Sequence, residues 1–364
     1  MKLKMERQAL LTGLQAVQNV VSQRSTLPVL YNVLIQAENN QVALTTTDLD
    51  LSVRCTVKAE VGKSGATTLP ARRLFSIVRE LGDTNVEIES DDHHEVSVRC
   101  GSSFFKIKGM SDEDFPPMPR AEGNTGFRTG QGVFKEMLRK THYAASTEET
   151  RYVLNGVLTS FRDGKLTMVA TDGRRLALVE QDLDFSKEDE TDMILPSKAV
   201  HELLHTLGGE GELSIHGEKN QMMFEFNNIV MSTKLIEGVY PNYGQVIPSE
   251  CEERIAVERE SLLTALRRVS LVMTDKSNAT KLTFGNNSLV ITSMTPDVGE
   301  ARESIPIKYD GKQISVAFNP EYVMDPLKNL DNDELFFELT DDMSPGVLKT
   351  DIPFLYVLMP VRLS

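Results

Sequence analysis

The chain has 364 residues, 40% of them hydrophobic and 6% aromatic, and a formal net charge of −14. A chain of this length exceeds one ordinary hydrophobic core, so two or three domains are expected. No apolar run approaches the ~20 residues that span a bilayer, and the N-terminus lacks the apolar core of a signal peptide, so a cytoplasmic location is expected.

The first predicted elements are a helix followed by three strands. Apolar residues from Leu10 to Val21 recur at helical spacing, and strands are expected after them at residues 29–37, 41–47 and 51–61. A second helix should begin after Pro70, because proline often stands at the entry to a helix. The alternating apolar residues from Val86 to Ile107 then predict strands with one face in water.

The rest of the chain repeats this pattern twice. Related segments recur at intervals of about 124 residues in two registers, which begin at Leu44, Met168 and Ile291 and at Pro70, Pro196 and Pro320. Counterparts of the first helix are expected at residues 134–141 and 262–272. Proline-rich breaks at 112–119 and 240–248 separate the copies, so the sequence predicts three domains, at residues 1–121, 124–247 and 250–364.

Each copy is predicted to hold two βαβββ halves, in which antiparallel sheets back a pair of helices. The expected fold class is therefore α+β, with three tandem domains. The cysteines Cys55, Cys100 and Cys251 are odd in number and widely spaced, which argues against a disulfide framework or a cysteine-based metal site. We expect them to be reduced, buried strand residues.

Four segments carry a resemblance to a known family. They are residues 24–30 (Arg-Ser-Thr-Leu-Pro-Val-Leu), 151–156 (Arg-Tyr-Val-Leu-Asn-Gly), 169–176 (Val-Ala-Thr-Asp-Gly-Arg-Arg-Leu) and 356–363 (Tyr-Val-Leu-Met-Pro-Val-Arg-Leu). With the three tandem copies, the whole chain resembles the bacterial sliding clamps, the β subunits of DNA polymerase III. The resemblance implies a head-to-tail homodimer that closes into a ring, with sheets outside and helices lining the hole.

The same resemblance implies a function without catalysis. A clamp is a processivity factor that encircles double-stranded DNA and uses no cofactor. Its expected partners are the replicative DNA polymerase, the clamp loader and other proteins with a clamp-binding motif of the Gln-Leu-x-Leu-Phe type. These clients would dock in a cleft between the second and third domains.

The resemblance also assigns the residues of this client cleft. An apolar cleft with a few polar rim groups suits a short peptide anchor, although core packing is the alternative for Leu154, Val246 and Val357. Gln245, Ser277 and Pro345 differ from what the family leads us to expect. The assigned residues are Leu154, Thr171, Gly173, Arg174, Arg175, Leu176, Pro241, Val246, Asn319, Tyr322, Met343, Val357, Met359, Pro360, Val361, Arg362 and Leu363.

A ring also accounts for the acidic composition, which by itself argues against DNA binding. Enclosure needs only an inner wall that does not repel DNA. The helical segments 71–81 and 134–142 are locally basic, whereas acidic residues gather in residues 182–192. The DNA-facing positions implied by the family are Arg24, Arg72, Tyr152 and Lys198. For each basic residue, the alternative is a solvated helix face.

The dimer is expected to join the first domain of one chain to the third domain of the next. Residues 103–108 should form an edge strand that pairs with a strand near residues 301–305, because an unpaired edge invites strand addition. Further contacts are expected for Ile107 with Val272, and for Arg73 with Asp297, Glu300 or Glu303.

Two other interpretations compete with the clamp. His201-Glu202-Leu-Leu-His205 matches the H-E-x-x-H signature of zinc metallopeptidases. The other two copies carry no histidine at the matching helix positions, and no third ligand is evident, although Glu225 lies at a tolerable distance in sequence. A scaffold protein that binds partners without DNA would share every structural feature. Asp48 and Asp172 could be paired acids, but turn residues at strand ends are the favoured interpretation.

Overall fold

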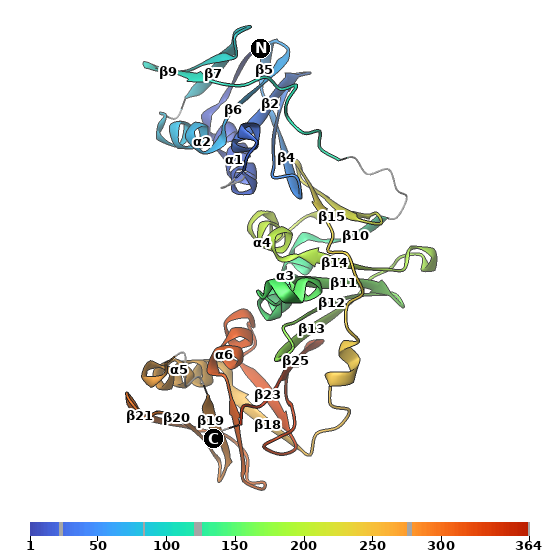
Figure 1. The fold of residues 1–364 in the computed structure, drawn as a ribbon, viewed down its shortest axis with the longest axis vertical. Coiled ribbons are helices and arrows are strands. Elements are labelled where there is room, and N and C mark those ends of the chain that lie inside the picture. The colour runs from blue at the N-terminus through green and yellow to red at the C-terminus, as the bar shows by residue number, and fades with distance from the viewer. Residues whose placement is uncertain (22–24, 83, 120–125, 275–278, 363–364) are drawn as a thin grey trace. The chain divides into compact units, whose positions relative to one another are not determined.

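The fold is described from a computed structural model, which covers residues 1–21, 25–82, 84–119, 126–274 and 279–362 (Figure 1). Within these residues, no helix is long and apolar enough to cross a membrane. Each third of the chain contains the strand–helix–three-strand pattern twice, which confirms the predicted pair of βαβββ halves.

The first repeat alternates strands and helices as the sequence indicates. Its first half comprises β1 (Lys2–Glu6), α1 (Arg7–Val17), β2 (Asn32–Glu38), β3 (Gln41–Thr47) and β4 (Leu51–Lys58). Its second half comprises β5 (Glu60–Lys63), β6 (Gly65–Pro70), α2 (Ala71–Glu80), β7 (Asn85–Ser90), β8 (Glu95–Cys100) and β9 (Ser103–Lys108).

The second repeat follows the same order. Its first half comprises β10 (Gly126–Gly130), α3 (Gln131–Thr141), β11 (Gly156–Arg162), β12 (Lys165–Thr171) and β13 (Arg175–Asp182). Its second half comprises β14 (Thr191–Pro196), α4 (Ser197–Thr206), β15 (Glu212–Gly217), β16 (Gln221–Phe226) and β17 (Ile229–Lys234). Short 3-10 turns lie before β11 and after β17, at η4 (Glu149–Leu154) and η6 (Tyr243–Val246).

The third repeat completes the chain. Its first half comprises β18 (Glu253–Glu258), α5 (Arg259–Val269), β19 (Thr280–Gly285), β20 (Ser288–Thr295) and β21 (Gly299–Pro306). Its second half comprises β22 (Ile314–Phe318), α6 (Pro320–Asn329), β23 (Glu334–Leu339), β24 (Gly346–Lys349) and β25 (Phe354–Leu358).

Several predicted boundaries need correction. The strand expected at residues 29–37 begins only at Asn32, because Pro28 opens a 3-10 turn, η2 (Pro28–Tyr31). Proline has no amide hydrogen and a fixed φ, which suits the start of a turn rather than a ladder. The strand expected at residues 51–61 is divided between β4 and β5. Cys251 is half-buried and precedes β18, unlike the buried strand residues Cys55 and Cys100.

All described strand pairings are antiparallel, and two sheets join strands from different repeats. One eight-stranded sheet has the order β10-β15-β16-β17-β4-β3-β2-β6, so β17 of the second repeat pairs with β4 of the first. The other has the order β14-β11-β12-β13-β25-β24-β23-β18, so β13 pairs with β25 of the third repeat. A five-stranded sheet ends in β9 and a four-stranded sheet ends in β21.

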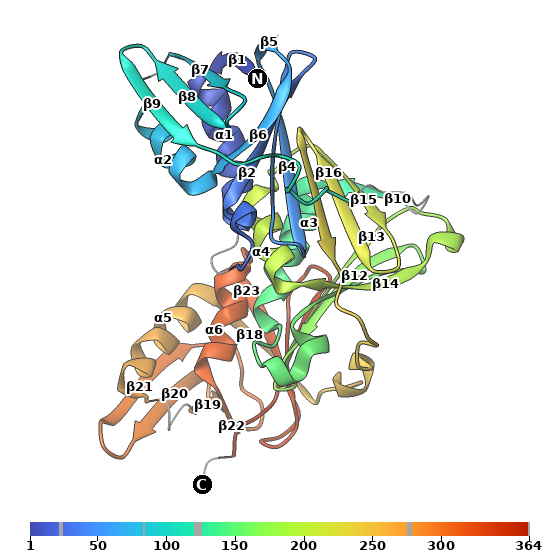
Figure 2. The ribbon, with the colours of Figure 1, turned by 45° about the horizontal axis from the view of Figure 1, so that its top comes forward.

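These shared sheets explain how the chain divides into compact units. Unit 1 comprises Met1–Lys135 and Lys198–Leu235, and unit 2 comprises Glu136–Ser197 and Ile236–Ser364. The middle repeat is divided between them, because β10, β15, β16 and β17 continue the first repeat's sheet, whereas β14, β11, β12 and β13 continue the third repeat's sheet. In unit 1, α1 packs against α2 and β4, and in unit 2, α5 packs against α6 and β21 (Figures 1 and 2).

The turns that follow β3 and β12 have the same construction. The carboxylate of Asp48 accepts the amides of Asp50 and Leu51, and that of Asp172 accepts the amides of Arg174 and Arg175. Both aspartates are therefore turn residues, as the favoured interpretation predicted.

The second residue of each turn, which follows the aspartate, has a left-handed backbone conformation. Its φ is +81° at Leu49 and +83° at Gly173. Glycine adopts this conformation without steric cost, whereas a side chain with a Cβ is strained by about 1–2 kcal/mol. The Leu49 side chain is 46% exposed, so its packing offsets little of that strain.

Replacing Leu49 should reveal this strain. We expect Leu49→Gly to be more stable than Leu49→Ala by about 1 kcal/mol, because alanine keeps the Cβ that the positive φ disfavours. Urea unfolding of the two variants beside the parent chain measures the difference. Equal stability of the glycine and alanine variants would contradict strain at this turn.

Candidate functional site

The pairing of β13 with β25 forms an apolar junction inside unit 2. Leu176 lies opposite Val357, and the Met359 amide extends the pairing by donating to the Arg174 carbonyl at 2.9 Å. A buried cluster underlies the junction, made of Leu158, Val169, Leu176, Ile194, Ile236 and Val357. The sequence-predicted residues Leu176 and Val357 thus meet in one core, and they supply a rigid apolar floor.

The segments that flank this floor carry exposed apolar side chains. Val246 in η6 is 47% exposed, and its neighbours Tyr243 and Ile247 pack on the buried cluster. Met359, directly after β25, is 43% exposed. Exposed Val and Met side chains beside a buried apolar floor are suited to cover an inserted apolar anchor.

The remaining predicted cleft residues have varied structural roles. Thr171 donates its hydroxyl to the Arg175 carbonyl, Asn319 caps α6, and the Val361 amide donates to the Ala317 carbonyl. Others occupy adjoining segments: Leu154 at the end of η4, Pro241 before η6, Met343 before β24, and Pro360 and Arg362 after β25. Leu363 lies outside the described residues, as does Ser277.

Tyr240 belongs to the site but was missed from the sequence. It packs against the buried cluster, and its hydroxyl accepts the amide of Thr171 at 3.1 Å. Burial raises the pKa of Tyr240, so the phenol stays protonated. The repeat offered a signal, because Tyr240-Pro241 matches Phe115-Pro116 at the end of the first repeat.

Arg175 ties the turn after β12 to helix α6. Its guanidinium donates to Asp172 at 3.1 Å, to Asp325 at 2.5 Å and to the Tyr143 carbonyl at 2.6 Å. The same group lies 4.3 Å from the centre of the Tyr322 ring. Burial opposes its charge, but Tyr356 and Asp325 together raise the pKa of Arg175 further. A planar, permanently charged group is needed to satisfy so many acceptors at once.

A second arginine connects the same turn to η4. The Arg151 guanidinium donates to the Asp172 carbonyl and pairs with Glu148 at 3.1 Å. Arg174 approaches the same Glu148 carboxylate at 3.8 Å. Glu148 and Arg174, together with Asp172, border a polar cavity of about 270 Å³. Tyr152, a predicted DNA-facing residue, lies on η4 and is 56% exposed.

The other predicted DNA-facing residues differ in their surroundings. Arg72 is exposed on α2, whereas Arg24 lies outside the described residues. Lys198 forms an ion pair with Asp48, and burial lowers the pKa of Lys198. Its charge is therefore largely neutralised within unit 1, which the sequence did not indicate.

The basic helix faces are also less positive than the sequence suggests. In α3, Arg139 bonds to both Glu136 and Asp331, and Lys135 donates to the Leu207 carbonyl at 2.7 Å. In α5, Arg268 pairs with Glu303 at 3.1 Å. Asp331 and Glu303, which come from other segments, therefore cancel part of the positive charge of α3 and α5.

The two edge strands predicted at the dimer contact are present in separate units. β9 presents Phe104, which is 57% exposed, and the Arg99 guanidinium lies 5.4 Å from the centre of its ring. Ile107 is instead buried in its own unit, because strand alternation turns it inward beside Val96. The predicted contact of Ile107 with Val272 of a partner chain therefore stays a prediction.

On β21 and its neighbours, the expected contact residues are only partly exposed. Asp297 and Glu300 are exposed and Val272 is half-buried. Glu303 is half-buried and forms an ion pair with Arg268 of the same chain at 3.1 Å. Arg73 itself is exposed on α2.

The H-E-x-x-H segment has an orientation that differs from a metal site. His201 and His205 are exposed on α4, but Glu202 is buried. Its Oε1 atom is buried without a hydrogen-bond partner, and burial raises the pKa of Glu202 to about 7, although Asn19 and Lys198 oppose the shift. Glu225 is exposed on β16. Among the described residues, no three His, Cys, Asp or Glu side chains are grouped to hold a metal ion.

The buried carboxyl makes stability depend on pH. The folded pKa of Glu202, about 7, exceeds its ordinary value of 4.5, so the stability that it contributes is present at low pH and lost as pH rises through 7. We expect Glu202→Gln to match the parent chain near pH 4 and to exceed its stability by roughly 2–3 kcal/mol at pH 8.

Denaturant unfolding across this pH range measures the effect of Glu202→Gln. Glu225→Gln is the matched control, because that carboxylate is exposed in the same unit. A stability gain that does not change with pH would show that burial of the charge is not its cause.

Comparison with known proteins identifies the family. Residues 1–119, 129–242 and 244–362 match the N-terminal, central and C-terminal domains of the DNA polymerase III beta subunit. The chain is 34% identical over 363 residues to the beta sliding clamp of Chlamydia muridarum, covering 100% of this chain and 99% of that protein. It is 31% identical over 368 residues to the beta sliding clamp of Pseudomonas aeruginosa, covering 100% of both.

Solved structures agree with the sequence relatives. The DnaN sliding clamp of Bartonella birtlesii, crystallised with griselimycin, covers 100% of both chains with a TM-score of 0.95 and 34% identity. The clamp of Bacillus subtilis gives a TM-score of 0.95 at 28% identity, again over 100% of both chains. These matches do not support a zinc peptidase or a scaffold unrelated to replication. The chain therefore belongs to the DNA polymerase III beta subunit family, the bacterial DNA sliding clamps, which are processivity factors and not enzymes.

Proposed function

We propose that two copies of this chain join head to tail into a ring around duplex DNA in the cytoplasm. The clients would be the replicative polymerase and other proteins with a clamp-binding motif, and a clamp loader would open the ring. The observation that carries the client-binding part is the junction of β13 and β25, where exposed Val246 and Met359 flank a buried apolar floor. We call this junction the client cleft.

The client cleft suits a peptide with aliphatic and aromatic anchors. Leu176 and Val357 provide a floor held by strand pairing, so little ordering is required when a ligand binds. Methionine at position 359 can repack around different anchors, because its side chain is unbranched. Arg175, fixed by Asp172 and Asp325, holds the turn beside the floor in place.

Removing the two exposed apolar side chains should weaken peptide binding. We expect the double variant Val246→Ser, Met359→Ser to bind a Gln-Leu-x-Leu-Phe peptide about ten- to a hundredfold more weakly, because each residue loses apolar area that the ligand would cover. Calorimetry measures the affinity.

The matched control for this double variant is Val239→Ser. Val239 is 91% exposed in the segment that precedes η6, so its loss should leave affinity unchanged. If the double variant bound the peptide as tightly as the parent chain, the client cleft would not be the peptide-binding site.

The ring rests on the edge strands of the two units. β9 and β21 each end a sheet, and an unpaired edge is a template for a strand from another chain. Exposed Phe104 on β9 and Met294 on β20 add apolar area near these edges. Since isolated surface ion pairs contribute ~0–1 kcal/mol each, the apolar contacts should dominate any dimer made here.

Substituting Phe104 tests the ring and its hold on DNA together. We expect Phe104→Asp to shift the mass in light scattering from dimer to monomer at micromolar concentration, because a charge would be buried at the contact. A clamp loader would place the parent chain on nicked circular DNA. The chain should then stay on the DNA at high salt and be released when the circle is cut to a linear form.

The Phe104→Asp variant should dissociate from the circular DNA at high salt, because it cannot form a closed ring. Lys106→Gln is a control on the same strand, because its ammonium already pairs with Glu95 within the protomer. Tight binding of the parent chain to short linear duplex at physiological salt would contradict holding by enclosure, since phosphate contacts weaken as salt rises.

A further inference from the structure

The junction of β4 and β17 in unit 1 has the same backbone construction as the client cleft. Ser52 lies opposite Ser232 in this junction, as Leu176 lies opposite Val357 in the client cleft. The Lys234 amide donates to the Asp50 carbonyl at 2.8 Å, and the Met359 amide donates to the Arg174 carbonyl at 2.9 Å. Each of these residues therefore has a counterpart at the same place in the other junction.

The linker that follows each junction's repeat is also placed alike. The Met110 amide donates to the Thr68 carbonyl at 3.1 Å, and the Ile236 amide donates to the Ile194 carbonyl at 3.0 Å. Phe115 then packs on a buried cluster with Leu34, as Tyr240 packs on the cluster that contains Leu158. With the matched turns at Asp48 and Asp172, the correspondence covers the floor, the turn and the linker.

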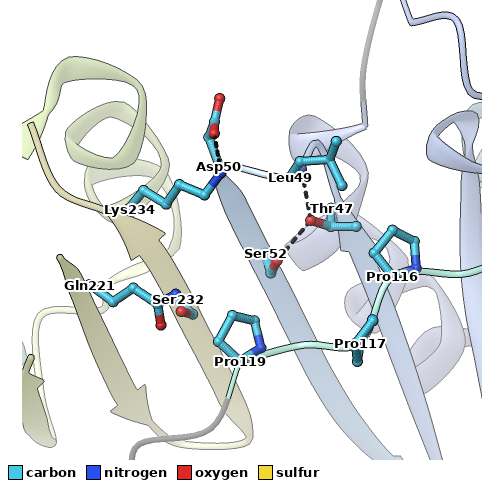
Figure 3. A pocket seen from close by; sticks show the side chains of 10 residues that line it. All are labelled: Thr47, Leu49, Asp50, Ser52, Pro116, Pro117, Pro119, Gln221, Ser232 and Lys234. Carbon is cyan, nitrogen blue, oxygen red and sulfur yellow. Dashed lines mark hydrogen bonds and ion pairs between the residues drawn. The ribbon is translucent and has the colours of Figure 1, made fainter.

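A small pocket opens at this second junction (Figure 3). Its volume is about 80 Å³, and its lining comes from the turn after β3, from β4, β16 and β17, and from the proline-rich linker. The lining includes Leu49, Asp50, Ser52, Ser232 and Lys234. Figure 3 shows the prolines on one side and the ion pair of Asp50 with Lys234, at 3.0 Å, on the other.

The side chains differ from the client cleft where an apolar anchor would sit. Ser52 and Ser232 stand in place of Leu176 and Val357, and Lys234 stands in place of Met359. The Ser52 hydroxyl is hydrogen-bonded to Thr47 at 2.7 Å. An aliphatic or aromatic anchor would gain little apolar contact here and would remove the exposed ion pair of Asp50 with Lys234 from water, which is unfavourable.

We propose that this junction is a second copy of the peptide groove, and that Leu49, Ser52, Ser232 and Lys234 are the residues that exclude clients from it. The proposal rests on the function proposed for the client cleft. It deepens that function by explaining why one chain, with two grooves of the same backbone, offers a single site for apolar anchors. Specificity here comes from rejection of the ligand at the wrong groove.

The experiment replaces four residues of the second groove by those at the matching positions of the client cleft. The variant Leu49→Gly, Ser52→Leu, Ser232→Val, Lys234→Met is made in a background whose client cleft carries Val246→Ser and Met359→Ser. A Gln-Leu-x-Leu-Phe peptide is titrated by calorimetry into the parent chain, the background and the converted chain. We expect the converted chain to bind at least about tenfold more tightly than the background, with one peptide per chain.

Two further variants keep the result interpretable. The matched polar set combines Ser52→Thr, Ser232→Thr and Lys234→Arg in the same background. It preserves the polarity of the groove, so its affinity for the peptide should equal that of the background. If the four-residue variant fails to fold, the double variant Leu49→Gly, Lys234→Met can replace it, because it changes only exposed side chains. Its affinity for the peptide should still exceed that of the background a few-fold.

The outcomes separate this proposal from the one on which it rests. A folded converted chain that binds no better than the background would overturn the second groove, as would equal gain in the matched polar set. If the parent chain itself failed to bind the peptide, the client cleft would be wrong instead. A peptide with a photoreactive residue should label the β4–β17 segments in the converted chain and the β13–β25 segments in the parent.

Discussion

Strand pairing between repeats is the constraint on which this structure depends. β17 pairs with β4 and β25 pairs with β13, so each junction is a continuous sheet and not a contact between finished domains. The backbone hydrogen bonds that hold it are obligatory, because unpaired buried amide groups are costly. A groove formed at such a junction is as rigid as the sheet. Little free energy is therefore lost in ordering its backbone when a ligand binds.

Arg175 adds ion pairs and hydrogen bonds to the strand pairing at the junction of β13 and β25. It joins Asp172 in the turn after β12 to Asp325 in α6, two carboxylates that come from different repeats. A half-buried charge is tolerated only when its partners are well placed, and this guanidinium also meets the Tyr143 carbonyl and the Tyr322 ring. The turn beside the client cleft is thus fixed by both strand pairing and charge.

The distribution of charge is decided by neighbours in space. Lys198 is paired with Asp48, and Arg139 is paired with Glu136 and Asp331, so these cations carry less free charge than their helices suggest. Arg72 and Arg73 on α2 remain exposed. An acidic chain that surrounds DNA needs only a weakly attractive wall, and partial neutralisation of this kind is compatible with sliding.

The sequence by itself determined the repeat and the order of elements. Periodicity and proline placement located β3 at Gln41–Thr47 and the helices that begin after Pro70 and Pro196, because these signals are local. The resemblance supplied Leu176 and Val357. Only the tertiary structure decided that Ile107 faces inward and that Glu202 is buried. It alone joined Arg175 to Asp325, 150 residues away, since a one-dimensional pattern shows which face of an element is apolar but not which distant segment will cover it.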